Sequence, residues 1–284
     1  MELDLQQVSQ IVQRALEEDI DGGDLTSDTL FSESMSGKAE IIAKQGGILA
    51  GLPVAEMTFQ KLDEAMQWEA KKPEGAAVSP GEIVVVLKGN LRAILNGERV
   101  ALNFLQRMSG IATLTRRFVK ETEGYPAKIL DTRKTAPGLR VLDKYAVRMG
   151  GGFNHRFGLY DGILLKDNHL RAAGSIGEAV RRLRQRLSPT DRIEVEVCTL
   201  PEVEEALQAG ADILLLDNMS AAEIEQAMGL VHRKALGRKA LVEASGGVNL
   251  NNVKQIAATG VDYISVGALT HSAPALDISL ELAA

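Results

Sequence analysis

From residue 128 onward, short apolar runs alternate with stretches whose apolar residues recur at helical spacing. The apolar runs predict strands at 128–132, 161–166, 192–197, 212–217, 241–246 and 262–267. The stretches between them predict helices at 138–150, 175–187, 201–210, 220–231 and 249–260. Repeated βα units give parallel strands joined by helical crossovers, and strands that are apolar throughout are buried on both faces. This part of the chain is therefore expected to form either a (β/α) barrel or a doubly wound sheet.

A residue with useful chemistry stands at the carboxyl end of nearly every predicted strand. These residues are Arg133 and Lys134, Lys166, Glu196, Asp217, Ser245 and Gly246, and Gly267. In a barrel the carboxyl ends of the strands meet at one mouth, where active sites are built, whereas an open sheet would spread them along a line. We therefore favour an α/β barrel. Because six strands are predicted, we expect the barrel to be incomplete.

The first part of the chain is organised differently. Apolar residues at helical spacing predict a helix at 5–18, which the Asp- and Gly-rich segment 19–24 ends. Short apolar runs separated by Gly and Pro then predict a compact α+β unit with a helix at 53–65. A further helix at 97–123 is expected to connect the two parts, with the domain boundary near Ser109 and Gly110.

The composition excludes several classes of protein. With 284 residues, of which 45% are hydrophobic, the chain can bury two cores, while a net charge of −6 and 4% aromatic residues argue against a nucleic-acid surface. No stretch reaches the roughly 20 apolar residues that cross a bilayer, and the charged N-terminus does not resemble a signal peptide. The single cysteine, Cys198, lies in an apolar run and is expected to be a small buried residue. A reducing cytoplasm is the expected location.

The segment 131–169 carries seven Lys and Arg residues against four Asp residues, which makes it cationic within an acidic protein. Arg matches the two oxygens of a carboxylate, and Lys supplies a compact charge for phosphates. Arg133 and Lys134 precede a Pro-Gly turn, and Gly150 to Gly152 lead into His155 and Arg156, where a backbone without side chains allows a ligand to approach. We predict a site for a small polyanion. An ordinary solvated loop, and a structural role for His155, remain alternatives.

Three carboxylates accompany these cations. Glu194 and Glu196 are two residues apart on one strand, so they face the same side, and Asp217 ends the next strand. Inward carboxylates require compensation by a lysine, Lys134 or Lys166, or by a divalent metal. Oxygen donors of this kind suit Mg²⁺ bound together with substrate phosphates. A network of salt bridges inside the barrel remains the alternative, above all for Glu194.

Glycine-containing loops close the last two predicted strands, at Ser245, Gly246 and Gly247 and at Val266, Gly267 and Ala268. Loops after the final strands of a barrel commonly hold a phosphate through backbone N–H groups. Both loops are therefore candidate phosphate sites.

Several longer motifs together resemble one known family. They are EDIDGGDLTSD at 18–28, GERVALNFLQRMSGIATLT at 97–115, DTRKTAPGLR at 131–140 and KYAVRMGGGFNHRFGLYDGILLKDNH at 144–169, with EASGGV and TGVDYISVGALTHS near the end. The chain resembles the quinolinate phosphoribosyltransferases over essentially its whole length. The resemblance implies a type II phosphoribosyltransferase fold: an N-terminal α/β sandwich at 1–109, an incomplete α/β barrel at 110–269, and a C-terminal tail at 270–284 that returns to the N-terminal domain.

The resemblance also implies an activity and a set of roles. The enzyme would transfer phosphoribosyl from phosphoribosyl pyrophosphate to quinolinate, with loss of CO2, in NAD biosynthesis, as a homodimer that uses Mg²⁺. The roles implied for the residues are these: Arg133, His155 and Arg156, with Arg99 of the partner subunit, for the carboxylates of quinolinate; Lys134 and Lys166 for the pyrophosphate donor; Glu196 and Asp217 for the ribose hydroxyls and Mg²⁺; and 245–247 and 266–268 for the 5′-phosphate, with Thr132 in the same substrate-binding run as Arg133.

Two other functions remain open. The chain could be a related phosphoribosyltransferase for another aromatic acid, such as the molybdenum-operon paralogues that resemble this family. It could also be a non-catalytic barrel that binds a phosphorylated sugar, although such a protein would have no use for Glu196 and Asp217.

Overall fold

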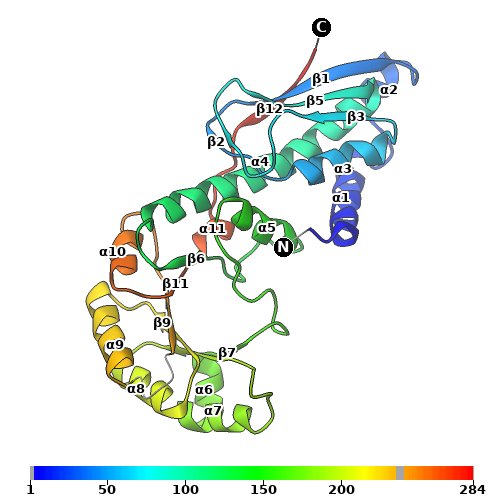
Figure 1. Cartoon of the computed structure of the whole chain (residues 1–284). Helices are drawn as coiled ribbons and strands as arrows, with labels where there is room; N and C mark the ends of the chain where they lie inside the picture. The colour runs from blue at the N-terminus through cyan, green and yellow to red at the C-terminus, as the bar shows by residue number, and fades with distance from the viewer. Residues whose placement is uncertain (1–2, 235–239, 284) are drawn as a thin grey trace. The chain divides into compact units, whose positions relative to one another are not determined.

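The computed structural model describes residues 3–234 and 240–283, which form two compact units (Figure 1). Unit 1 consists of Met1–Arg116, Thr135–Gly151 and Leu269–Ala284, and unit 2 of Arg117–Lys134 and Gly152–Ala268. The helices of unit 1 are α1 (Leu5–Ile20), α2 (Leu25–Leu30), α3 (Leu52–Leu62), α5 (Arg140–Met149) and most of α4 (Leu91–Glu121) and of α11 (Ala268–His271).

Unit 1 is built on an antiparallel sheet in the order β12-β1-β5-β3. Its strands are β1 (Ser36–Ala43), β3 (Gln67–Ala70), β5 (Ile83–Asn90) and β12 (Ile278–Leu282), and β2 (Gly47–Ile48) pairs separately with β4 (Ala77–Val78). Helices α3 and α4 lie along one face of the sheet (Figure 1), and Ile41, Phe59, Leu87 and Ile94 are fully buried between the two layers. This is the predicted α+β sandwich.

The C-terminal segment runs back across unit 1 and ends in β12, which pairs with β1 from Ala39 and Leu282 to Ala43 and Ile278. Before this strand, the N–H of Leu276 donates to the carbonyl of Gln106 at 2.9 Å. Gly110 in α4 permits the approach, since a Cβ there would lie 2.1 Å from the carbonyl oxygen of Pro274. The tail is therefore bound to unit 1 by a strand pairing and by close contact with α4.

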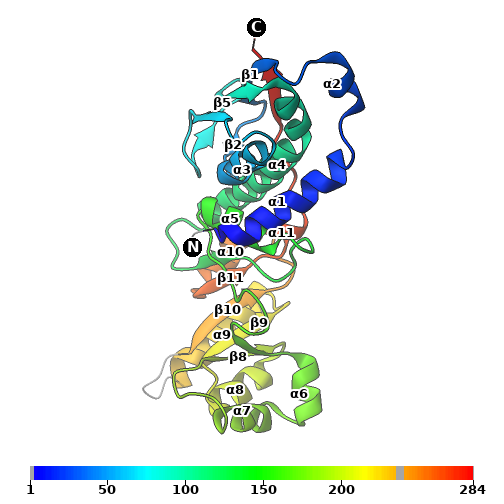
Figure 2. The same cartoon turned by 90° about the vertical axis from the view of Figure 1, so that its right-hand side faces the viewer.

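Unit 2 contains a parallel sheet in the order β6-β11-β10-β9-β8-β7, with six strands among the residues that the structure describes. The strands are β6 (Lys128–Leu130), β7 (Ile163–Leu165), β8 (Ile193–Val197), β9 (Ile213–Asp217), β10 (Leu241–Ser245) and β11 (Tyr263–Ser265). Figure 2 shows β8 to β11 side by side. Since β6 pairs with β11 while β7 pairs only with β8 in this sheet, the barrel is open between β6 and β7, as predicted.

The crossovers of unit 2 are the helices α6 (Asp167–Ala173), α7 (Ile176–Arg184), α8 (Leu200–Ala209), α9 (Ala221–Lys234) and α10 (Val253–Ala258), and α11 (Ala268–His271) follows β11. Ser175 and Thr199 cap the starts of α7 and α8 by accepting backbone N–H groups. The apolar faces of α7 and α8 bury residues such as Val180 and Val203, whereas no residue of α6 is buried.

The two compact units are not separated at the predicted domain boundary of 109 and 110, which stays a prediction. Helix α4 runs without a break from Leu91 to Glu121, and the division falls inside it, after Arg116. The segment Thr135–Gly151, which contains α5, also belongs to unit 1. Because α4 is one continuous helix, no turn or break in the sequence marks the residue at which its contacts change from one unit to the other.

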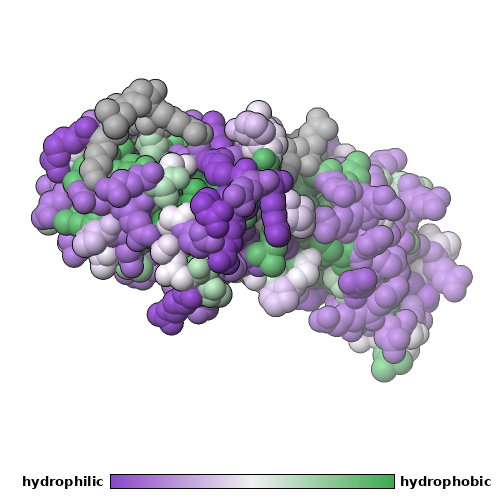
Figure 3. Space-filling model, turned by 90° about the horizontal axis from the view of Figure 1, so that it is seen from below, coloured by the Kyte–Doolittle hydropathy of each residue, from purple (hydrophilic) through white to green (hydrophobic). Residues whose placement is uncertain are grey.

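The molecular surface in Figure 3 is largely hydrophilic, with apolar residues scattered over it. Among the described residues, no helix combines the length and the apolar character that crossing a membrane would require.

Candidate active site

All but one of the residues predicted for the site lie in unit 2. Thr132, Arg133 and Lys134 follow β6, Lys166 follows β7, Glu196 and Asp217 lie on β8 and β9, residues 245–247 close β10, residues 266–268 follow β11, and His155 and Arg156 lie between α5 and β7. Because the strands are parallel, their carboxyl ends share one rim of the sheet. Arg99 is the exception, since it lies on α4 in unit 1, where it is exposed.

Lys166 and Glu196 form an ion pair at this rim. Nζ of Lys166 lies 3.5 Å from Oε2 of Glu196, on neighbouring strands of the sheet. Of the compensating cations that the sequence left open, Lys134, Lys166 or a divalent metal, it is Lys166 that lies beside Glu196. The lysine side chain is 49% exposed, so solvent screening keeps the pair weak and either group can exchange its partner for a ligand.

The loop after β10 is tied to the end of β9. The N–H of Asn218 donates to the carbonyl of Ser245 at 2.9 Å, and its side-chain amide donates to Oδ2 of Asp217 at 2.8 Å. Gly246 has a φ of 86°, and a Cβ there would lie 2.3 Å from Oδ1 of Asn218, so only glycine fits. The glycine in this motif therefore serves the close approach of two strand ends, which brings Asp217 and the predicted phosphate loop together.

His155 lies against two glutamates inside unit 2. Its Nε2 is 3.3 Å from Oε2 of Glu194 on β8 and 3.5 Å from Oε2 of Glu243 on β10, and its Nδ1 accepts the N–H of Arg156 at 2.7 Å. Both glutamates are buried, with side chains 8% and 3% exposed. Glu194 is thus part of a salt-bridge network inside the barrel, which was the alternative interpretation of this residue.

The segment that carries His155 is attached to β6. Phe153 and Leu130 form a parallel bridge, and the fully buried Asp131 accepts the N–H of His155 at 2.9 Å and the side-chain amide of Asn154 at 2.5 Å. Asp131 therefore fixes the backbone from which His155 and Arg156 project.

Burial changes the acid-base properties of this cluster. Loss of solvent raises the pKa of Glu243 to about 7, with the neighbouring Glu194 raising it further, while His155 and Ser265 oppose the shift. Burial lowers the pKa of Arg156, and the nearby Arg133 lowers it again, whereas Glu194 raises it. Glu243 is thus largely protonated below neutral pH, and the two arginines are close enough to repel each other. A dianion bound between them would relieve this repulsion.

Sequence analysis did not identify Glu243, Asp131 or Asn154. Asp131 and Asn154 act on the backbone, and nothing in their spacing shows that 153–155 returns to β6. Glu243 could have been found, because it precedes Ser245 by two residues and therefore faces the same side of its strand, just as Glu194 and Glu196 do.

Two groups of side chains could bind a metal ion. Glu196 and Asp217 supply only oxygen donors and are part exposed, which fits Mg²⁺ that also takes oxygens from a substrate. Among the described residues, His155, Glu194 and Glu243 form the one group of three candidate ligands within 4.8 Å of one another. In this group, Nε2 of His155 lies 3.3 Å from Oε2 of Glu194 and 3.5 Å from Oε2 of Glu243, so the three side chains contact one another directly.

The prediction that Cys198 is buried was wrong. Strand β8 ends at the buried Val197, and Cys198 is the first residue beyond it, where its N–H donates to Glu202 and its side chain is exposed. The buried strand ends at Val197, one residue before Cys198, although the apolar run in the sequence continues through Cys198.

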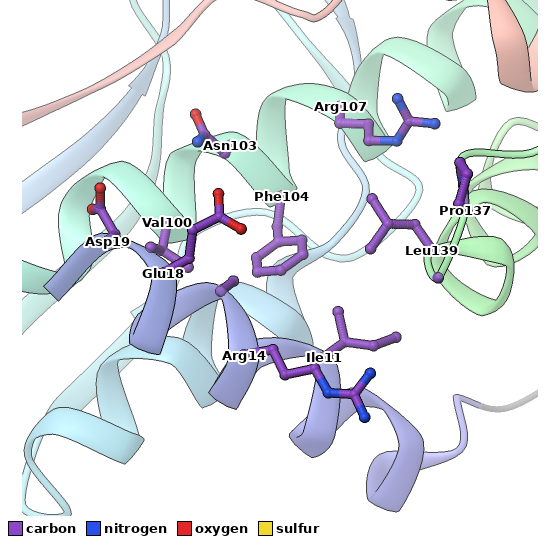
Figure 4. Close-up of a pocket in the computed structure, with 12 residues that line it drawn as sticks. Ile11, Arg14, Glu18, Asp19, Val100, Asn103, Phe104, Arg107, Pro137 and Leu139 are labelled. Carbon is purple, nitrogen blue, oxygen red and sulfur yellow. The ribbon is translucent and has the colours of Figure 1, made fainter. Parts of the chain in front are cut away.

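A separate depression lies in unit 1, between α1, α4 and the turn at 137–139 (Figure 4). It has a volume of about 430 Å³, and its lining includes Arg14, Glu18, Asn103 and Phe104. None of the residues predicted for the site lines it, although Asn103 stands one helical turn after Arg99.

Comparison with known proteins shows which family the chain belongs to. Residues 24–109 and 111–281 match the N-terminal and C-terminal domains of quinolinate phosphoribosyl transferase. A Bacillus subtilis protein named "Probable nicotinate-nucleotide pyrophosphorylase [carboxylating]" is 46% identical over 276 residues, which cover 97% of this chain and 93% of that protein. A Nicotiana tabacum protein named "Quinolinate phosphoribosyltransferase [decarboxylating] 1b" is 43% identical, with 96% of this chain and 81% of that protein covered. The structure of the nicotinate-nucleotide pyrophosphorylase from Francisella tularensis superposes with a TM-score of 0.93 at 41% identity, over 99% of this chain and 98% of that one. The chain belongs to the quinolinate phosphoribosyltransferase family.

Proposed function

We propose that the protein transfers phosphoribosyl from phosphoribosyl pyrophosphate to quinolinate and releases pyrophosphate, CO2 and nicotinate mononucleotide, a step of de novo NAD biosynthesis. One observation carries the proposal: separate sets of cations and carboxylates stand at a single rim of the parallel sheet in unit 2, in a chain that matches both domains of the family. The cations suit the carboxylates of a diacid and the phosphates of the donor, and the carboxylates suit the ribose hydroxyls of the donor and Mg²⁺.

Arg133 and Arg156 are proposed to hold the two carboxylates of quinolinate, with His155 beside them and Arg99 of the partner subunit completing the site in a homodimer. Burial lowers the pKa of Arg156, and the charge of the nearby Arg133 adds to this effect. The proximity of the two cations supports a dianionic ligand between them. Each charge-assisted hydrogen bond contributes about 1.5 to 3 kcal/mol, so two arginines distinguish a dicarboxylate from a monocarboxylate by orders of magnitude.

Lys134 and Lys166 are proposed to face the pyrophosphate of the donor, and Thr132 to contact substrate beside them. Glu196 and Asp217 would hold the ribose hydroxyls and Mg²⁺, and the loops 245–247 and 266–268 would hold the 5′-phosphate. When bound, Mg²⁺ would neutralise charge on the leaving pyrophosphate. The weak pairing of Lys166 with Glu196 supports these assignments, because both groups can turn to a ligand at little cost.

The reaction then follows from charge. The pyridine nitrogen attacks the anomeric carbon as pyrophosphate leaves, and Glu196 and Asp217 stabilise the positive charge that develops on the ribose. The alkylated nitrogen is cationic, so it stabilises the electron pair that stays on ring carbon 2 when the 2-carboxylate leaves as CO2. A proton from water then bonds to this carbon and completes nicotinate mononucleotide. The protein must hold the 3-carboxylate firmly while it avoids stabilising the 2-carboxylate in the ground state.

Release of CO2 from carboxyl-labelled quinolinate, in the presence of phosphoribosyl pyrophosphate and Mg²⁺, tests the activity directly. Other aromatic acids are assayed alongside, since a paralogue would prefer one of them. The variants Arg133→Ala and Arg156→Ala are expected to raise the KM for quinolinate by about tenfold or more. Unchanged KM and turnover in both variants would remove the carboxylate assignment.

Subunit mixing tests the shared site. Arg99→Ala and Lys134→Ala proteins are each expected to be inactive, and exchange of their subunits should restore part of the activity, because one of the two sites in a mixed dimer is intact. No recovery after verified exchange would exclude a contribution from Arg99 of the partner subunit. We further propose that the enzyme works in the cytoplasm.

A further inference from the structure

Both ring nitrogens of His155 make contacts within unit 2. Nδ1 accepts the N–H of Arg156 at 2.7 Å, so this nitrogen carries a lone pair and the ring proton is on Nε2. Nε2 in turn faces Oε2 of Glu194 at 3.3 Å and Oε2 of Glu243 at 3.5 Å. The ring is therefore held in one tautomer and one orientation by groups on β8, on β10 and on its own backbone.

Stability gives no reason for an acid at position 243. The residue is 2% exposed, and its Oε1 has no hydrogen-bond partner in the part of the chain that the structure describes. A buried carboxylate with an unsatisfied oxygen destabilises the folded state, and an apolar side chain of similar size would be at least as stable there. The Glu243 side chain makes two polar contacts: a hydrogen bond with Ser265, and the approach of its Oε2 to Nε2 of the His155 ring at 3.5 Å.

The ring of His155 determines where Arg156 lies. The backbone of Arg156 is tied to Nδ1 of that ring, and its guanidinium donates through Nη1 to the carbonyl of Gly162 at 2.8 Å. Turning the ring would break the first contact and release the start of the Arg156 side chain. An arginine placed about 1 Å away from its position would no longer match both oxygens of a carboxylate.

We propose that Glu243 is a positioning residue of the quinolinate site: together with Glu194, which is hydrogen-bonded to Nε2 at 3.4 Å, it holds the ring of His155, and the fixed ring holds Arg156 where it receives the carboxylate of the acid. The inference rests on the function proposed above. It assigns Glu243 an effect on the diacid alone, because neither His155 nor Arg156 is part of the set proposed for the donor.

Kinetics of Glu243→Met test the proposal, since methionine is close to glutamate in shape and lacks an acceptor oxygen. The KM for quinolinate should rise about tenfold, while kcat stays within about threefold and the KM for phosphoribosyl pyrophosphate does not change. Glu243→Gln keeps an acceptor oxygen and should recover most of the loss. Asp212→Asn is the matched control: Asp212 is a buried acid of the same unit that pairs with Arg184 before β9, and its loss should leave both KM values unchanged.

A double-variant cycle shows whether the effect passes through the histidine. In a His155→Phe protein the ring is present without its nitrogens, so Glu243→Met should cause no further rise in the KM for quinolinate. An equal rise in both backgrounds, or an unchanged KM in Glu243→Met, would overturn the proposal. A fall in kcat together with a rise in both KM values would also overturn the proposal, because that result indicates general damage to the fold.

A spectroscopic measurement decides the point independently of activity. The chain has four histidines, so ¹⁵N-histidine labelling gives a simple spectrum, in which His155→Phe identifies the signal. The wild type should show His155 with its proton on Nε2, and Glu243→Met, or Glu243→Leu if the first variant folds poorly, should change the populations of the two tautomers. An unaltered His155 signal would contradict the proposal. If the wild type failed to use quinolinate, the proposed function would be wrong, and this spectrum would still show whether Glu243 fixes the ring.

Discussion

Raising the pH is expected to destabilise the protein through Glu243. Its pKa is raised from 4.5 to about 7 in the folded state by burial and by Glu194. A carboxyl group whose folded pKa is raised contributes its full stability below the unfolded value, and this contribution is lost as the pH rises through the folded value. The window is therefore about pH 4.5 to 7, in which the buried carboxyl becomes charged.

The size of the effect follows from the two pKa values. The difference between 4.5 and about 7 corresponds to about 3 kcal/mol, as an upper limit for a group coupled to its neighbours. Glu243→Gln is neutral at every pH and cannot make this contribution. Measured against the wild type, the free energy of unfolding of the variant should therefore increase by about 2 to 3 kcal/mol between pH 5 and pH 8.

Urea unfolding at several pH values, monitored by exchange of amides on β8 to β10 in unit 2, measures the difference. Glu178→Gln serves as the control, because its pKa is lowered to about 2 by Arg181 and Arg182. That contribution is present above 4.5 and lost only as the pH falls, so the control should run parallel to the wild type between pH 5 and pH 8. Parallel curves for Glu243→Gln would refute the account of Glu243 as a buried acid.

Two further changes probe contacts that hold unit 1 together. Gly110→Ala should destabilise the protein by about 1 to 3 kcal/mol, because the added Cβ would lie 2.1 Å from the carbonyl oxygen of Pro274. Gly229→Ala is the control within another helix. Its Cβ would lie 3.3 Å from the flexible end of the Arg233 side chain, so this variant should stabilise the protein by up to about 1 kcal/mol. Urea unfolding of the pair gives the signs, and equal signs would contradict the explanation. Asp143→Asn should cost about 3 kcal/mol, because the fully buried carboxylate receives both arms of Arg107, at 2.9 and 2.8 Å, and the N–H of Ala136. Amide exchange at 135–139 should become faster in this variant, and unchanged exchange there would show that Asp143 does not hold the turn.

The parallel sheet was predictable because each of its strands is a short apolar run between Gly or Pro signals. All six observed strands lie within the predicted ranges, and each is shorter than its range. Helix α6 was missed, and the reason is physical: none of the residues in Asp167–Ala173 is buried, so the segment has no apolar periodicity to detect. Ile278, Leu280 and Leu282 alternate with polar residues, which is a strand pattern, but the pairing of β12 with β1, far away in the chain, is not encoded locally.

The polar residues of the site were predictable only in part, because strand ends can be located from sequence while inward contacts cannot. Lys166 and Glu196 meet because neighbouring parallel strands end at one rim, and this could be expected from the order of the elements. The partner of Glu194 could not, since His155 reaches it from a loop that is attached to β6 through Leu130. The burial of Asp131 could not be predicted either, because it depends on the segment 153–155 lying against β6.

The alternation of a strand explains why two glutamates on β8 serve different purposes. Glu194 and Glu196 face the same side but differ in depth by two residues, which is about 6.6 Å. The outer carboxylate pairs with a half-exposed lysine and can exchange it for a ligand, whereas the inner one is enclosed with His155 and Glu243. A charge at the rim is therefore available for binding, and a charge one layer below can act only through the side chain that it holds. By this reasoning, removing Glu196 should weaken contact with the donor, and removing Glu243 should weaken the placement of the acid.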